Sequence, residues 1–143
     1  MGPKIILVTQ ARLGSTRLPG KVLKKINGKS LLEIHLDRLM KCKNISEIIV
    51  ATTTNIEDDV IYKKSIEFGV NSTRGSELDV LDRFYQSVKN KNVDWIVRVT
   101  SDCPLIDPIL VDQVVDFVQK KKYGLWIKYN DSTISRRTRC RSF

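Results

Sequence analysis

The chain has 143 residues, of which 41% are hydrophobic, and a formal net charge of +9. This length suits one domain, and the apolar share excludes a globally disordered chain. Three cysteines without CxxC spacing and a single histidine exclude a disulfide framework and a zinc site. No apolar run has the length of a membrane span or a signal peptide, so we expect a cytoplasmic protein without a membrane partner.

Continuous apolar runs at residues 4–9, 47–51 and 95–99 predict three buried parallel strands. Each run is followed by a polar loop, and helical patterns separate the runs. Strands that alternate with helices predict an α/β fold, in which a parallel sheet has helices on both faces. Ligands of such sheets bind outside the carboxyl ends of the strands, where these polar loops meet.

The helices are predicted from their start and stop signals. Ser30 opens a capping box before one helix, and Ser76 has the same pattern before another that runs to about residue 89. A third helix is predicted over residues 57–68, with Gly69 as its stop. Asp107 is predicted to be the N-cap, rather than a ligand, of a helix that extends to about residue 122.

The loop at residues 11–21 reads A-R-L-G-S-T-R-L-P-G-K. It has no GxGxxG fingerprint, and it is not a Walker A loop because its glycines are one residue too far apart. Gly14 allows backbone amides to approach an anion, while Arg12, Arg17 and Lys21 can donate to phosphate oxygens. Composition alone leaves two interpretations open: a triphosphate-binding loop and a solvated basic turn.

Three motifs in order resemble one family. The first motif is similar to the N-terminal signature of the cytidylyltransferase-like proteins related to the spore-coat-polysaccharide protein SpsF, and it reads Q-A-R-L-G-S-T-R-L-P-G-K-V-L. These proteins are relatives of the CMP-sialic acid and CMP-KDO synthetases. R-G-S-E-L-D-V-L-D-R-F at 74–84 and R-V-T-S-D-C-P-L-I-D-P at 98–108 agree, with Ser101 where the family usually has glycine. The resemblance covers about residues 4–122. It implies a Rossmann-like nucleotide-diphospho-sugar transferase fold whose C-terminal half is missing here.

The resemblance also implies an activity, which is sugar cytidylyltransfer in polysaccharide or glycan precursor biosynthesis. An oxygen of a sugar or sugar-phosphate acceptor would attack the α-phosphorus of CTP, and pyrophosphate would leave. Mg²⁺ is the implied cofactor, because such transfer depends on positioning and charge neutralisation. A homodimer is left open as the assembly.

Family positions carry over to this sequence one by one. Asp102 is the implied Mg²⁺ ligand, with a turn cap as the alternative, and Arg17 and Lys21 are the implied catalytic residues. The implied nucleotide-binding residues are Ala11, Arg12, Gly14, Ser15, Arg17, Lys21, Arg74 and Ser76.

Other polar side chains suggest structural roles. Asp82 and Arg83 are predicted to lie on a solvated helix face, and His35 is predicted to be a packing residue within an apolar helix face.

The family pattern stops near residue 123. We therefore divide the chain into a nucleotide-binding part, residues 1–123, and a basic tail, residues 124–143, which carries five basic residues against one acid. The family's later segment often reads Pro-Glu-Gly-Leu-Asp-Val-Glu-Val-Phe, and one permissible coding of it, read one base early, translates as residues 135–143. A frameshift is therefore our hypothesis for the tail.

Two alternative functions follow from the tail. The replaced segment would hold the family's second metal ligand and sugar-binding half, so one alternative is a catalytically inactive nucleotide-binding fragment. The other is a basic nucleic-acid-binding protein. It is the least favoured, because the remaining +5 on residues 1–123 is ordinary and the aromatic residues are not interleaved with the basic ones.

Overall fold

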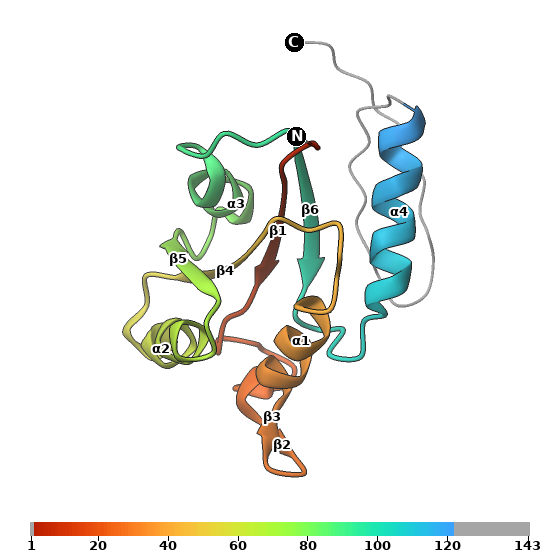
Figure 1. Ribbon diagram of the computed structural model, residues 1–143. Coiled ribbons are helices and arrows are strands. Elements are labelled where there is room, and N and C mark those ends of the chain that lie inside the picture. The colour runs from red at the N-terminus through yellow and green to blue at the C-terminus, as the bar shows by residue number, and fades with distance from the viewer. Residues whose placement is uncertain (1, 122–143) are drawn as a thin grey trace.

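A four-stranded parallel sheet forms the centre of the computed structural model, which describes residues 2–121 (Figure 1). The strands lie in the order β5-β4-β1-β6, and every neighbouring pair is parallel. Their bounds are Ile5–Gln10 for β1, Glu47–Thr53 for β4, Asn71–Gly75 for β5 and Trp95–Thr100 for β6. The predicted parallel sheet is confirmed, and it brings the carboxyl ends of β1, β4 and β6 to one edge.

Helices cover both faces of this sheet. Leu32, Leu36 and Leu39 of α1 pack with Ile61 of α2 and with Leu7 on one face. Phe84 and Val88 of α3 pack on the other face against Ile6, Val8, Ile49 and Ala51. The helices are α1 (Leu31–Leu39), α2 (Asp59–Glu67), α3 (Val80–Val88) and α4 (Pro108–Lys121), with the short 3-10 turns η1 (Lys21–Leu23) and η2 (Ile56–Asp58).

The central strand β1 has no solvated face, which explains its continuous apolar run. Leu7 points to the α1 and α2 side, whereas Ile6 and Val8 point to the α3 side, and all three are fully buried. Successive side chains of a strand point to opposite faces, so a strand covered on both sides needs apolar residues at every position.

A small hairpin that the sequence analysis missed connects the opening loop to α1. It consists of β2 (Lys25–Ile26) and β3 (Lys29–Ser30), joined by Asn27-Gly28. Both turn residues have positive φ, 49° for Asn27 and 83° for Gly28, as a two-residue hairpin turn requires. Ser30 then begins α1 with the predicted capping box, in which its hydroxyl accepts from the Glu33 N–H.

Strand β5 and the start of α3 differ from the prediction. Strand β5 lies at the edge of the sheet, and its sequence Asn-Ser-Thr-Arg-Gly contains no apolar run. The sequence pattern therefore did not predict this strand. The N-cap of α3 is Asp79, whose carboxylate accepts from the Asp82 N–H at 2.8 Å. The capping box predicted at Ser76 is therefore wrong. Ser76 instead accepts from the Asp79 N–H at 3.0 Å in the preceding turn.

Two other helix boundaries agree with the prediction. Gly69 has φ of 82° directly after α2, the left-handed conformation expected of a helix stop. Asp107 precedes α4, and its carboxylate accepts from the Ile109 N–H at 2.9 Å. Asp107 thus caps this helix, as predicted.

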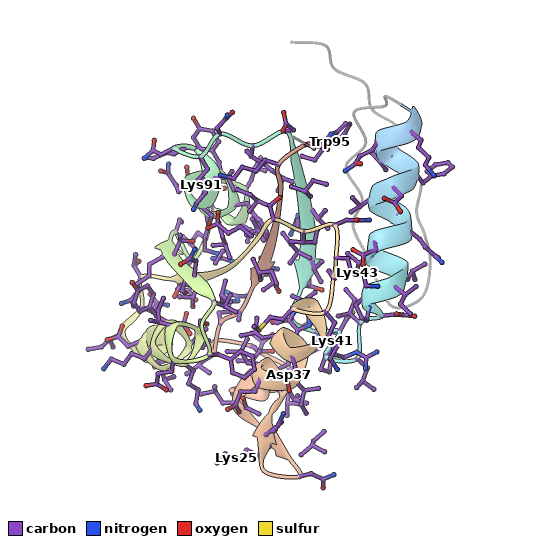
Figure 2. The ribbon with its side chains drawn as sticks, in the orientation of Figure 1. Lys25, Asp37, Lys41, Lys43, Lys91 and Trp95 are labelled. Atoms are coloured by element: carbon purple, nitrogen blue, oxygen red, sulfur yellow. The ribbon has the colours of Figure 1, made fainter. Side chains whose placement is uncertain are left out.

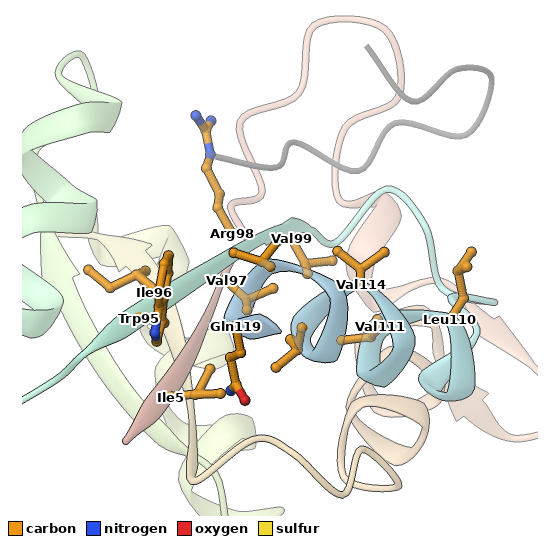
Figure 3. A pocket seen from close by; sticks show the side chains of 12 residues that line it. Ile5, Trp95, Ile96, Val97, Arg98, Val99, Leu110, Val111, Val114 and Gln119 are labelled. Atoms are coloured by element: carbon orange, nitrogen blue, oxygen red, sulfur yellow. The ribbon is translucent and has the colours of Figure 1, made fainter. Parts of the chain in front are cut away.

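An apolar groove of about 60 Å³ lies between β6 and α4 (Figure 3). Val97, Val111 and Val115 are among the side chains that line it, and Arg98 points away from α4.

Trp95 lies at the opposite end of the molecule from Lys25 of the hairpin (Figure 2). Within residues 2–121, no helix has the length and apolar character that crossing a membrane requires.

Candidate functional site

A polar pocket of about 230 Å³ opens where β1 and β6 end. The opening loop forms one wall, and residues from α3 and from the loop after β6 form the others. Six residues that the family resemblance marked line this pocket: Ala11, Arg12, Ser15, Arg17, Lys21 and Asp102. The fold therefore brings together segments that are about ninety residues apart in the sequence, because parallel strands β1 and β6 end at the same edge.

Lys21 and Asp102 form an ion pair across the pocket. The Lys21 Nζ lies 2.5 Å from Asp102 Oδ1, and the two side chains are 29% and 57% exposed. Asp102 is the only acidic residue that lines the pocket within the described part of the chain, whereas Arg12, Arg17, Lys21 and Arg83 all contribute positive charge. The pocket therefore attracts anions.

A buried carboxylate fastens the opening loop. Asp58 of η2 is 2% exposed, and its Oδ1 accepts from the Leu13 backbone N–H at 2.8 Å. Its other oxygen accepts from the Thr53 hydroxyl at the end of β4. No local sequence pattern marks Asp58, because its partner Leu13 is 45 residues away. This contact holds the loop near its start, at Leu13, against the end of β4.

A second, exposed contact lies on the outer side of the loop. Arg12 Nη1 is 3.4 Å from Glu77 Oε1, and Asn55 donates to Glu77 Oε2 at 2.7 Å. Gly14 lies beside the same carboxylate, where a Cβ would be 3.5 Å from Glu77 Oε1. Because the Arg12 and Glu77 side chains are both exposed, this pair adds little stability and leaves Arg12 free to turn toward an anion.

Arg74 and Ser76 do not line the pocket. Arg74 donates to the carbonyls of Thr53 and Asn55 at 3.0 and 2.8 Å and pairs with Asp59 at 2.5 Å. It therefore ties β5 to the end of β4. The nucleotide-binding role of these two residues stays a prediction.

Arg83 is buried, and its predicted place on a solvated face is wrong. It is 2% exposed and donates to the Ser76 carbonyl at 2.6 Å and to the Gln10 side chain at 3.2 Å. The helical spacing does indicate that Arg83 is buried, because Val80, Arg83, Phe84, Ser87 and Val88 form one stripe along α3. Arg83 was nevertheless assigned to the surface because arginine is mostly solvent-exposed in proteins.

His35 is a packing residue, as predicted, and it also links three segments. It is fully buried in α1. Its Nδ1 lies 3.0 Å from the Cys103 carbonyl, which can only accept, so Nδ1 carries the proton. Its Nε2 then accepts from the Thr9 hydroxyl at 3.0 Å. Burial lowers the pKa of His35, although the Cys103 hydrogen bond and the charge of Asp102 act in the opposite direction.

We expect the free energy of unfolding to fall as the pH falls below about 6.5. The unfolded chain then binds a proton at the only histidine, whereas the folded chain, with its lowered pKa, does not. The slope should approach about 1.4 kcal/mol per pH unit. Urea titrations between about pH 6.5 and pH 5 would measure it, since carboxylates titrate mostly below this window. His35→Gln should lose the slope, and an equal slope in both proteins would contradict the assignment.

The donor set at Asp102 fits Mg²⁺ bound together with a phosphate ligand. Among residues 2–121, no group of three or more His, Cys, Asp or Glu side chains could hold a metal ion by itself. Mg²⁺ in nucleotide sites, however, takes one or two carboxylates and completes its shell with phosphate oxygens and water. One exposed carboxylate beside a cationic loop meets that requirement.

Comparison with known proteins gives one consistent result. A family model described as Cytidylyltransferase matches residues 5–138. The spore coat polysaccharide biosynthesis protein SpsF of Bacillus subtilis is 37% identical over 115 residues, which are 78% of this chain and 48% of that protein. A cytidylyltransferase structure from Leptospira borgpetersenii superposes with a TM-score of 0.81 at 36% identity, covering 87% of this chain and 52% of that one.

A second solved structure is CMP:2-keto-3-deoxy-manno-octonic acid synthetase complexed with CTP. It superposes with a TM-score of 0.75 at 26% identity, covering 85% of this chain and 49% of that one. The chain thus spans about half the length of the curated relatives it matches. The boundary predicted at residue 123 and the tail at 124–143 lie outside the described residues and stay predictions.

Proposed function

The chain belongs to the cytidylyltransferase family, and from this premise we propose that its pocket binds CTP for transfer of the cytidylyl group to a sugar or sugar-phosphate acceptor. The observation that carries the proposal is the position of the cationic opening loop against Asp102, at the carboxyl edge of a parallel sheet. The likeness to a synthetase complexed with CTP supports the choice of nucleotide.

The loop residues would bind and orient the triphosphate. Arg12 and Arg17 can each offer two parallel N–H donors to phosphate oxygens, and Lys21 adds a compact charge. Such fixed donors stabilise the negative charge that develops as pyrophosphate leaves. The acceptor's attacking oxygen would approach the α-phosphorus from the side opposite the leaving pyrophosphate.

Asp102 would hold Mg²⁺ together with the phosphates. When bound, the ion would neutralise phosphate charge and help to position the leaving group. In the protein described here, Asp102 pairs with Lys21, so ligand binding would separate the two side chains and release Lys21 toward the phosphates.

The test is a thermal-shift panel of CTP, UTP, GTP and ATP, each with and without Mg²⁺. A nucleotide at one hundred times its dissociation constant should stabilise the folded chain by about 2.7 kcal/mol. We expect the largest shift with CTP and Mg²⁺. Arg17→Ala should abolish most of that shift, because it removes a cation from the pocket wall.

A matched control is Lys63→Ala, which removes an exposed positive charge from α2, away from the pocket. It should leave the CTP shift unchanged. If none of the four nucleotides shifts the melting temperature, or if Arg17→Ala and Lys63→Ala reduce the shift equally, the proposed function is wrong for this chain.

A further inference from the structure

Gln10 and Thr100 form an incompletely hydrogen-bonded pair in the pocket wall. They are register partners at the ends of β1 and β6, so their side chains point to the same face of the sheet, which is the α3 side. Both line the pocket. Thr100 is 8% exposed, yet its buried hydroxyl has no hydrogen-bond partner within the described residues. A buried polar atom without a partner is costly, so its presence at a pocket wall calls for an explanation.

Arg83 determines the orientation of the Gln10 amide. A guanidinium can only donate, so the 3.2 Å contact with Arg83 Nη2 requires the oxygen, Oε1, at that position. The amide nitrogen must therefore point the other way. Within residues 2–121 this nitrogen donates no hydrogen bond, which leaves two N–H groups for a ligand.

The orientation is rigid because Arg83 itself is held. Its other terminal nitrogen donates to the Ser76 carbonyl at 2.6 Å, and its side chain packs over Gly75. A Cβ on Gly75 would lie 2.9 Å from Arg83 Cγ, so the guanidinium reaches Gln10 because residue 75 is a glycine. A buried arginine on α3 thus fixes a neutral amide on β1.

We propose that Gln10, oriented by Arg83, donates a hydrogen bond from its amide nitrogen to the nucleoside part of the ligand. This inference rests on the proposed function. The phosphates would occupy the side of the pocket formed by Arg12, Arg17 and Lys21. Gln10, Thr100 and the apolar Val80 line the pocket beside Arg83. Both terminal nitrogens of Arg83 already donate within the protein, to Ser76 and to Gln10, so this part of the wall suits a pyrimidine ring with a carbonyl acceptor. Gln10 is then a specificity residue, and Arg83 is a positioning residue.

The experiment compares Gln10→Glu and Gln10→Met, with CMP and inorganic pyrophosphate as separate probes in calorimetric titrations with Mg²⁺. Gln10→Glu is isosteric and gains a carboxylate that pairs with Arg83, so its melting temperature should be equal or higher. It nevertheless loses the donor, and CMP binding should weaken about tenfold. Gln10→Met should weaken CMP binding about threefold while pyrophosphate binds as in the wild type.

A control variant, Gln113→Glu, makes the same chemical change at an exposed position on α4 and should bind both probes normally. If both Gln10 variants bind CMP like the wild type, or if Gln10→Met weakens pyrophosphate as much as CMP, the inference is overturned while the proposed function stands. If the wild type binds neither CMP nor CTP, the proposed function fails and this inference fails with it.

Discussion

Replacing Asp58 with alanine is expected to destabilise the fold by about 2 to 4 kcal/mol and to weaken CTP binding at least tenfold. The substitution leaves the buried Thr53 hydroxyl and the partly buried Leu13 N–H without their acceptor. Each hydrogen bond to a charged group contributes about 1.5 to 3 kcal/mol, and an unpaired buried donor costs a similar amount. Urea denaturation measures the first effect and CTP titration the second.

The loss of CTP affinity follows from the position of Leu13. This residue lies between Arg12 and Arg17, so freeing its N–H loosens the part of the opening loop that carries these two arginines, and ordering the loop would then oppose binding. Glu57→Ala is the matched control, because it removes an exposed carboxylate from the neighbouring position of η2. A stable Asp58→Ala protein with normal CTP affinity would show that the loop does not depend on this anchor.

Lys21→Ala is expected to weaken CTP binding about 10- to 100-fold with little change in stability. A charge-assisted hydrogen bond to phosphate contributes about 1.5 to 3 kcal/mol. The pair that Lys21 forms with Asp102 is partly exposed, and such pairs contribute only about 0 to 1 kcal/mol to folding. Lys21→Ala should therefore weaken CTP binding with little loss of stability, whereas Asp58→Ala should reduce both.

The control for this variant is Lys24→Ala, an exposed lysine just after η1 that does not line the pocket. Both variants reduce the net charge equally, so a general loss of electrostatic attraction would affect them alike. CTP titration at low and at physiological salt distinguishes the two effects. Equal weakening by Lys21→Ala and Lys24→Ala would argue against a specific phosphate contact.

Three of the four strands of the sheet, most of the helices and the family could be predicted from local sequence patterns. A strand buried on both faces needs an uninterrupted apolar run, and such a run predicts Ile5–Gln10. Helix caps need particular residues at fixed spacing, and this spacing predicts the Ser30 capping box. The three motifs identified the family, and six of the residues they marked line one pocket.

Local patterns were insufficient where a role depends on a distant partner. The edge strand β5 has no apolar run, and Ser76 and Asp79 are both competent caps, so only packing decided where α3 begins. Asp58 and Arg83 are charged residues that a sequence assigns to the surface. Tertiary structure buries them because Leu13 and Gln10 lie opposite them, and the polar partners compensate the cost of removing each charge from water.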